Sequence, residues 1–504
     1  MKGKPLHRRA IRGVIGLLVV ASALSLAPVA RSQYTVNFQT NIISGVTSNW
    51  SGTYYVGYTN FADVLLVQNT GELSNGDGYL GYGAGSSNNS ARVTGPGSLW
   101  SNSGTLTVGY GSTSNTLTIS GGGQVLSGSG FVGVGVGSGS SNNSVLVSDV
   151  GSVWSNSGTI TIGNNHGYGG SLVISNGAHV TSAAGYVCGP FDFSVSNAVL
   201  VIGTGSVWSN SRTLAVGGSP NSGVSCSQLV VANGGLATSA SGIIGNGVSG
   251  NRALVTDMGS AWNDTGSLTV GNGGFLSGSY GNSLVISNGG QVVDTTAYVG
   301  NNSFSSNNSA RVAGGGVWQN NVLYIGYQGS SNSLLVSGGS VSATNLVIGF
   351  ASPVCNNLLQ LDSGTVVVTN TAHNATLEVR SGALVVNGGA LQADRLVITN
   401  ACALLVHAGG TLIVGSVVLD PNAFRITAVA QEGNNVRVTY LMGPGATNAL
   451  QAASGAAGGG YSTNGFSDIF VVTNNAVAGT VTNYLDAGAA TNVPARYYRV
   501  RLVP

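Results

Sequence analysis

Short runs of alternating apolar and polar residues recur along most of the chain. Leu, Val and Ile alternate with Thr and Ser in runs such as 106–108, 117–119 and 160–162. A period of two is typical of β-strands that bury one face, and the Asn-Gly, Gly-Gly and Ser-Gly pairs between runs supply the positive-φ residues of tight turns. Strands this short do not form a stable sheet alone. The pattern therefore predicts an all-β chain in which many short strands stack on one another.

The six tryptophans mark one internal repeat. Their successive separations are 50, 54, 54, 54 and 56 residues, and the text Gly-Ser-Leu/Val-Trp-Ser-Asn-Ser surrounds three of them. About four recognisable strands per repeat predict two or three solenoid coils, with each tryptophan at a turn. At roughly 4.8 Å per coil, the repeats are expected to form a rod on the order of 70–100 Å long. The repeat-marking residues are Trp50, Trp100, Trp154, Trp208, Trp262 and Trp318.

The pattern divides the rest of the chain into segments. Residues 33–330 carry the tryptophan-marked repeats, and residues 331–420 keep the strands and turns without tryptophan, which predicts further solenoid coils. In residues 421–504 short strands alternate with polar turns, as in a small β-sandwich. We expect this module to cap the open edge of the last coil. Its strands are predicted at 424–430, 436–441, 446–453, 466–473, 481–485 and 497–502.

Residues 1–32 have the parts of a secretory signal peptide. Five basic residues come before or at the edge of the apolar run 14–26, and Ala30-Arg31-Ser32 offers a small-x-small cleavage site. A retained N-terminal anchor is the alternative interpretation. No later run reaches the roughly 18 consecutive apolar residues that a transmembrane helix needs. We therefore expect export through the Sec pathway of a Gram-negative-type bacterium, to the cell surface or the medium, with no membrane span after cleavage.

Loss of this leader changes the charge balance. Six of the 17 basic residues lie in it, which leaves 11 arginines against 15 acids, a net charge of −4, and no lysine. A basic surface that suits phosphate backbones is absent, so nucleic acid is not an expected partner. Only 6% of residues are charged, yet 42% are hydrophobic, which is more apolar content than disordered chains have.

The four cysteines, Cys188, Cys226, Cys355 and Cys402, are widely spaced and form no CxxC pair. This spacing argues against a zinc site. Export permits disulfides between Cys188 and Cys226 or between Cys355 and Cys402, while thiols are the alternative that we favour.

The tryptophan-centred unit resembles repeats of bacterial autotransporter-type passenger domains and of PEP-CTERM-associated exported proteins. The matching texts are G-S-V-W-S-N-S-G at 151–158, L-T-V-G-N at 268–272 and L-V-I-S-N-G-G-Q-V at 284–292. The resemblance covers residues 45–330 closely and 331–420 loosely. It implies a right-handed parallel β-helix, surface display, and adhesive or matrix roles, and it brings no catalytic residues.

The C-terminal end departs from these relatives. It shows neither an autotransporter translocation domain nor a PEP motif with its hydrophobic helix and basic tail. Residues 495–504 instead resemble the small terminal modules of secreted verrucomicrobial and planctomycete proteins. The export route and the mode of surface attachment therefore stay open.

Acidic and histidine residues are the candidate catalytic groups, because many polysaccharide lyases and hydrolases are β-helices. Asp149 and Asp257 each lie five residues before a repeat tryptophan, where sister repeats have Gly95 and Gly203, so this position is predicted to be a positive-φ turn. Facing carboxylates of a glycosidase would have to come from pairs such as Asp63 with Asp77 or Asp257 with Asp264. His166, His179, His373 and His407 lack metal-ligand spacing. No catalytic residue, metal or cofactor is predicted.

The tryptophans leave two alternatives. If they are buried, they pack between coils; if they are exposed, they form an aromatic row on which sugar rings stack. We favour packing. The functional hypothesis is an exported, non-enzymatic structural or adhesive rod, whose partners are surface or extracellular polysaccharide or other surface proteins. The alternative is a carbohydrate-binding or polysaccharide-active β-helix.

Overall fold

The computed structural model describes residues 34–504, apart from 137–138, 190–193, 275–276, 352–355, 399–402, 420–424, 443–446, 457–459, 475–479, 492 and 504. The side chains of 219–224, 463 and 502 are also left undescribed. The predicted leader and two of the cysteines, Cys355 and Cys402, lie outside these residues.

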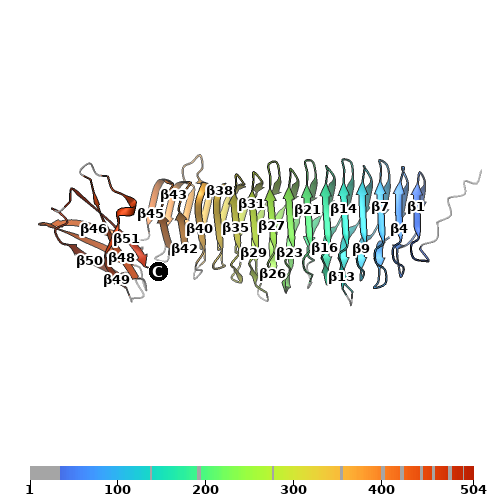
Figure 1. Ribbon diagram of the computed structural model, residues 1–504, viewed down its shortest axis with the longest axis horizontal. Coiled ribbons are helices and arrows are strands. Elements are labelled where there is room, and N and C mark those ends of the chain that lie inside the picture. Colours follow the sequence, from blue (N-terminus) through green and yellow to red (C-terminus); the bar gives the residue numbers. More distant parts are fainter. Residues whose placement is uncertain are drawn as a thin grey trace, which may run out of the picture.

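The repeats form a parallel β-solenoid, drawn as the long rod of Figure 1. Each coil gives one strand to each of three faces, and the strands of all coils belong to one 41-stranded sheet. Every strand pairs in parallel with the equivalent strands of the coils before and after it, as β7 does with β4 and β10. The predicted β-solenoid is confirmed.

The first face contains β1 (Thr40–Ser44), β4 (Val64–Gln68), β7 (Ser90–Thr94), β10 (Thr116–Ser120), β14 (Ser144–Ser148), β18 (Ser171–Ser175), β21 (Ala198–Ile202), β24 (Gln228–Ala232), β27 (Arg252–Thr256), β31 (Ser283–Ser287), β35 (Ser309–Ala313), β42 (Gly382–Val386) and β44 (Ala403–His407). The second face contains β2 (Thr47–Asn49), β5 (Glu72–Asn75), β8 (Leu99–Asn102), β11 (Gln124–Ser127), β15 (Val153–Asn156), β19 (His179–Ser182), β22 (Val207–Asn210), β25 (Leu236–Ser239), β28 (Ala261–Asp264), β32 (Gln291–Val293) and β36 (Val317–Gln319).

The third face contains β3 (Tyr54–Val56), β6 (Gly78–Tyr82), β9 (Thr105–Tyr110), β12 (Ser129–Val134), β16 (Thr159–Asn164), β20 (Ala184–Val187), β23 (Thr213–Val224), β26 (Ser241–Ser249), β29 (Ser267–Asn272), β33 (Thr296–Val299), β37 (Val322–Ile325), β39 (Asn345–Ile348) and β41 (Thr376–Val379). Four longer strands near the end run through a corner from one face into the next: β38 (Ser333–Ala343), β40 (Leu358–Val368), β43 (Ala390–Ile398) and β45 (Thr411–Leu419). Short pairs β13–β17 (Ser140–Ser141, Gly167–Tyr168) and β30–β34 (Ser279–Tyr280, Ser305–Ser306) extend the third corner.

One tryptophan-marked repeat is two coils, the lower of the two numbers expected. From Trp100 to Trp154 the chain passes through six strands of the large sheet, β8 to β12 and β14, rather than four. The expectation that each tryptophan lies at a turn is wrong, because the Gly-Ser pair before four of the tryptophans forms the turn and the strand begins directly after it. Gly97 and Ser98 make the turn, and Trp100 is already the second residue of β8.

Turn geometry confirms the interpretation of the two aspartates before the tryptophan strands. Asp149 and Asp257 have φ of 77° and 73°, and Gly95 and Gly203 both have φ of 91°. A backbone with positive φ accepts Gly freely and Asp at modest cost. These acids are therefore turn residues.

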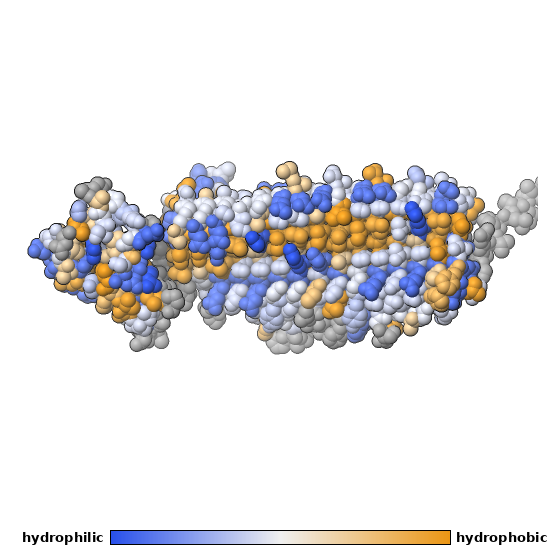
Figure 2. All heavy atoms as spheres, viewed as in Figure 1, coloured by the Kyte–Doolittle hydropathy of each residue, from blue (hydrophilic) through white to orange (hydrophobic). Residues whose placement is uncertain are grey.

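The outward side of the first face carries an aliphatic row. Successive coils place half-buried Leu or Val in register at its centre, with Ser, Thr and a few larger residues on either side. Figure 2 shows this row as an apolar band along the rod, between more hydrophilic margins. Its members are Leu146, Val173, Leu200, Val230, Leu254 and Val285.

The C-terminal module consists of two three-stranded antiparallel sheets, in the orders β46-β47-β50 and β49-β48-β51. Val438 and Tyr440 of one sheet and Leu450 of the other form its small core. All six predicted strands are present: β46 (Arg425–Glu432), β47 (Asn435–Met442), β48 (Thr447–Gly455), β49 (Ser467–Thr473), β50 (Thr480–Asp486) and β51 (Ala495–Val503), with a 3-10 turn η1 (Thr463–Gly465).

The expected capping of the last coil by this module is not observed. Val417 of β45 is in register with the buried Leu396 and therefore lies on the inward side of the last coil, yet it is 56% exposed with the module in place. The module lies beyond the end of the rod (Figure 1). Among the described residues, no helix is long and apolar enough to cross a membrane.

Candidate functional site: exposed tyrosine clusters on a ladder-built rod

A column of buried asparagines runs along the inside of the rod at the corner before the first face. Each side-chain oxygen accepts the backbone N–H of the preceding coil, and each side-chain NH₂ donates to the oxygen of the next asparagine where one follows. From Asn282 to Asn308 this side-chain bond is 3.0 Å long. We call this column the asparagine ladder; its members are Asn89, Asn115, Asn143, Asn197, Asn251, Asn282, Asn308, Asn332 and Asn357, all at most 1% exposed.

A glycine of the third face packs against each ladder position from Asn89 onward. Gly109, Gly163 and Gly217, for example, have φ near +80°, and a methyl group on any of them would overlap an asparagine side chain. Glycine is therefore required at the end of each Leu-Thr-Val-Gly text for two reasons. Its backbone adopts a left-handed conformation, and a side chain there would overlap the ladder asparagine.

We expect Gly271→Ala to destabilise the rod by about 2–4 kcal/mol, because it combines the positive-φ cost with overlap against Asn308. The matched control is Gly281→Ala, where φ is +62° but nothing lies within 4 Å of the new methyl group. This control is expected to lose only about 1 kcal/mol. Urea unfolding followed by tryptophan fluorescence would measure both, and equal losses would show that the ladder contact is unimportant.

Five of the six tryptophans lie inside the rod with no exposed surface: Trp100, Trp154, Trp208, Trp262 and Trp318. They occupy every second coil, in register with Val125, Val180, Ala237 and Val292 of the coils between them. The first four indoles also fill space left by a glycine of the third face, as Trp154 does above Gly130. A coil with a large indole thus alternates with a coil that makes room for it, which is why the repeat contains two coils.

Trp50 differs from the other five. It follows β2, is only partly buried, and its indole N–H donates to the Thr53 carbonyl at 3.0 Å. Its ring packs edge-on against Tyr54 in the first coil. The interior position of the other five leaves no exposed tryptophan row on which sugars could stack.

The aromatic residues that stack on the outside of the rod are instead tyrosines at the third face. Tyr55 stacks on Tyr79 with centroids 5.4 Å apart, and Tyr58, Tyr82 and Tyr110 form a second stack at 5.1 and 4.8 Å. We call these five residues the N-terminal tyrosine cluster. Tyr58 is 49% exposed, and the other four are half-buried.

A second group occupies the same two columns further along the rod. Tyr298 stacks on Tyr324 at 5.3 Å, and Tyr327 stacks on Phe350 at 4.6 Å. The Arg380 guanidinium lies 4.3 Å from the Phe350 ring centre and pairs with Glu378 at 2.8 Å. We call Tyr298, Tyr324, Tyr327 and Phe350 the C-terminal aromatic cluster.

The ring planes of neighbouring stacks are nearly perpendicular. Tyr55 and Tyr82 meet at 79°, and Tyr79 and Tyr82 meet at 89°, although each ring also stacks along the rod within its own column. Rings of one column therefore meet rings of the other edge-on, in a herringbone pattern. Because these tyrosines are half-buried or exposed, the cluster presents apolar ring surface together with phenolic hydroxyls.

Burial raises the pKa of Tyr55 and of Tyr79 above the ordinary tyrosine value, because packing disfavours the charged phenolate. Neighbouring tyrosines and Asp77 act in the same direction. These hydroxyls therefore remain protonated donors across the neutral range.

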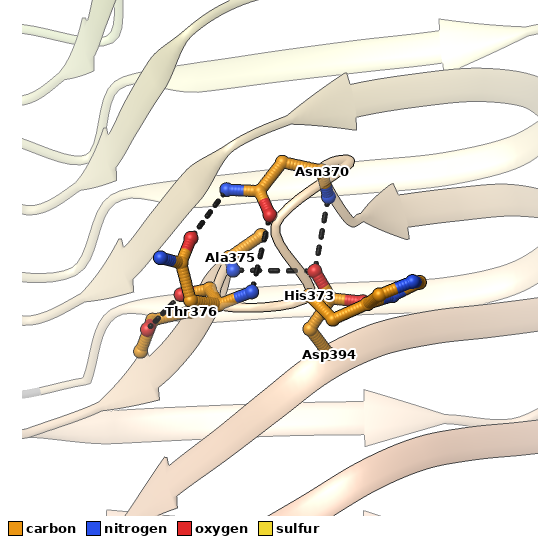
Figure 3. A network of polar contacts seen from close by, with 6 residues as sticks. Asn370, His373, Ala375, Thr376 and Asp394 are labelled. Carbon is orange, nitrogen blue, oxygen red and sulfur yellow. Dashed lines mark hydrogen bonds and ion pairs between the residues drawn. The ribbon is translucent and has the colours of Figure 1, made fainter.

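The His373–Asp394 pair has the residue types of a catalytic dyad, but its contacts are structural (Figure 3). Asp394 Oδ2 accepts the backbone N–H groups of Asn370 and Ala375 at 2.9 and 3.2 Å, which lowers the pKa of this carboxyl. The His373 side chain is 86% exposed, and no hydroxyl or thiol of the described residues bonds to its ring. The carboxylate fixes the loop between β40 and β41.

The acids of the two candidate glycosidase pairs also have separate structural roles. Asp63 occupies the first ladder position and accepts the Gln39 N–H at 2.8 Å, whereas Asp77 accepts the Thr105 N–H at 2.7 Å. Asp257 lies in a turn, and Asp264 lies inside the rod. The described residues contain no group of three or more His, Cys, Asp or Glu that could hold a metal ion.

Among the cysteines, Cys188 is buried and Cys226 is exposed, and both are thiols rather than halves of one disulfide. The Cys188 thiol donates to the Ser194 carbonyl at 3.1 Å.

The sequence contains signals for both the ladder and the clusters. An asparagine stands immediately before seven strands of the first face and before β38 and β40, which begin on that face. Tyr55 and Tyr58 recur one coil later as Tyr79 and Tyr82. Both signals recur about every 26 residues, the length of one coil. The tryptophans recur only at every second coil and therefore indicate twice this period. No family model matches the chain, and no curated protein or solved structure matches it either.

Proposed function

We propose that this chain is an exported, non-catalytic structural rod that adheres through its outer faces. The repeated residues support this proposal. The repeated asparagine, glycine and tryptophan residues all contact the interior of the rod, whose hydrophobic core is continuous along its length. The repeat thus specifies a long, regular surface, which suits display and adhesion.

Carbohydrate binding is the second candidate, and the two aromatic clusters favour it. Their uncovered ring faces can pack against the apolar faces of sugars, while the hydroxyls offer hydrogen bonds. The charged residues at the C-terminal cluster, Arg380 and Glu378, compensate one another, and the carboxylate of Asp77 is the charge that acts on Tyr55 and Tyr79 of the N-terminal cluster. A neutral polysaccharide is the partner class that this chemistry suits.

The first experiment combines the mature chain, residues 33–504, with a panel of soluble and insoluble polysaccharides. Co-sedimentation and the release of reducing or unsaturated ends would be scored in the same tubes. We expect binding without release, and at least a tenfold weaker affinity for the Tyr82→Ala/Tyr110→Ala variant. Tyr280→Ala is the control, because Tyr280 is 44% exposed and lies outside both clusters.

Each outcome is decisive for one part of the proposal. Release of ends would overturn the non-catalytic assignment. Absence of binding to every polysaccharide would reject the carbohydrate candidate and leave the structural role, which labelling of the chain on intact producing cells would test. Equal loss of binding in Tyr280→Ala would place the binding surface elsewhere.

A further inference from the structure

A second polar column lies inside the rod at the end of the second face. In the tryptophan coils it holds asparagine, whose side-chain NH₂ donates to a backbone carbonyl of the next coil: Asn102 to Leu126 at 3.2 Å, Asn156 to Thr181 at 3.4 Å and Asn210 to Thr238 at 3.4 Å. In the coils between them it holds serine, which donates to the oxygen of the next asparagine, as Ser127 does to Asn156 at 2.6 Å.

Asp264 takes the place of an asparagine in this column. Its Oδ1 accepts from Ser239 and from the Trp262 indole N–H, as an asparagine oxygen would accept from serine. Its Oδ2 therefore occupies the place of the NH₂ group and has no partner. By register, the group in front of it is the carbonyl of Val293, because Asn263 pairs with Val293. If Asp264 were ionised, its Oδ2 and the Val293 carbonyl oxygen would face one another as two acceptors with no hydrogen between them.

Asp294 takes the place of a serine in the following coil. The Trp318 indole N–H donates to its Oδ2 at 2.8 Å, and its Oδ1 has no partner. Asn320 comes next in the column, and both of its amide atoms also lack partners. Asp264 and Asp294 are each 5% exposed and Asn320 is 8% exposed, so water has little access to these groups.

No opposite charge compensates these carboxyls. The neighbouring strands β25, β26, β29, β31, β32 and β36 contain no Lys, Arg, His or Glu, and Arg252 of β27 and Tyr298 of β33 point outward. Two uncompensated carboxylates one coil apart would be strongly unfavourable in the interior.

We propose that Asp264 and Asp294 form a buried carboxyl pair that retains protons at neutral pH, so that the coils from β25 to β36 form a pH-sensitive segment of the rod. A protonated Asp264 supplies the donor that asparagine supplies in the sister coils. A proton on Asp294 likewise replaces the serine hydroxyl.

The direction of the pH effect follows from burial. Burial raises the pKa of Asp264 to about 7 and that of Asp294 to about 8; hydrogen bonds from Ser239, Trp262 and Trp318 act in the opposite direction, and the Asp264 charge raises the pKa of Asp294 further. The folded state therefore binds more protons than the unfolded state above the ordinary carboxyl pKa of 3.8. Stability falls as pH rises through this window and levels off above the folded pKa values.

The test compares the mature chain with Asp264→Asn/Asp294→Ser, which restores the residues of the sister coils. We expect the equilibrium constant for unfolding of the natural chain, relative to this variant, to rise up to tenfold per pH unit for each carboxyl between pH 5 and 7. Asp362→Asn is the control, because Asn387 and Gln360 lower the pKa of this exposed carboxyl. Its effect is expected to be independent of pH above 5.

Two results would overturn the proposal. A constant difference between the natural chain and the double variant from pH 5 to 9 would show that the pair carries no extra proton. Stabilisation of the natural chain alone by Ca²⁺ at pH 9, reversed by a chelator, would show that a metal ion occupies the orphaned oxygens. If the double variant fails to fold, the infrared spectrum at neutral pH decides the question: we expect a carboxylic acid C=O band in the natural chain that weakens in Asp264→Asn, and absence of this band would overturn the proposal.

Discussion

Replacing Asn282 by alanine is expected to destabilise the middle of the rod by about 4 kcal/mol. Asn282 accepts two hydrogen bonds from Asn251 and donates to Asn308, Ser279 and the Val248 carbonyl. Alanine would leave the buried Asn251 backbone N–H without its acceptor and its side-chain NH₂ with only the Ser249 carbonyl, and it would also remove the three bonds that Asn282 donates. Each buried group left unsatisfied costs about 1–3 kcal/mol. Urea unfolding, with hydrogen exchange of the backbone N–H of Asn251, would measure the loss.

The matched control is Asn301→Ala. Asn301 lies on the outside of the rod and makes a single side-chain bond, to Asn272 at 3.2 Å, in a half-exposed position. We expect it to lose less than about 1 kcal/mol, because water replaces the missing partner. A loss at Asn282 as small as that at Asn301 would contradict the view that the ladder holds successive coils together.

The ladder explains how a chain with 81 glycines and only 6% charged residues forms an ordered rod. Short strands provide few contacts within one coil, so stability comes from the interface between successive coils. At the corner, backbone N–H groups would be buried without partners. Asparagine oxygens accept them, as Asn115 does for Asn89 at 3.0 Å. The same side chain thus closes the corner and fixes the register.

The sequence predicted the all-β solenoid and the C-terminal strands because both depend on local alternation and turn residues. It also indicated the positive-φ turns at Asp149 and Asp257, since glycine and aspartate share that conformational tolerance. The two-coil repeat was recognised only by its tryptophans. The strands that sequence reasoning did not find, such as Leu99–Asn102, are only four residues long. Apolar and polar residues do not alternate visibly in them, because Ser and Asn follow the tryptophan directly.

The candidate surfaces were less predictable, because they depend on which coils lie side by side. Tyr55 and Tyr79 are 24 residues apart, and only the parallel register brings their rings together. The buried pair of Asp264 and Asp294 is equally hidden in the sequence, because one replaces an asparagine and the other a serine of different coils. Comparison of residues at the coil period, rather than at the tryptophan period, would reveal both.

The alternation of large and small coils predicts strong coupling between Trp208 and Gly185. Gly185→Ala alone places a methyl group against the Trp208 ring and is expected to destabilise the rod by about 2–3 kcal/mol. Trp208→Leu alone leaves a cavity and costs about 3–4 kcal/mol. The indole N–H of Trp208 has no hydrogen-bond partner, so the loss reflects packing alone.

In the double variant, the alanine methyl occupies space that the indole has left, so the two losses are expected to be non-additive by at least about 1 kcal/mol. Urea unfolding of the four proteins of this cycle measures the coupling. The control cycle combines Gly185→Ala with Trp262→Leu, because Trp262 packs against Gly242 and lies two coils further along. Additive losses in both cycles would mean that the two-coil period arises from something other than the fit between indole and glycine.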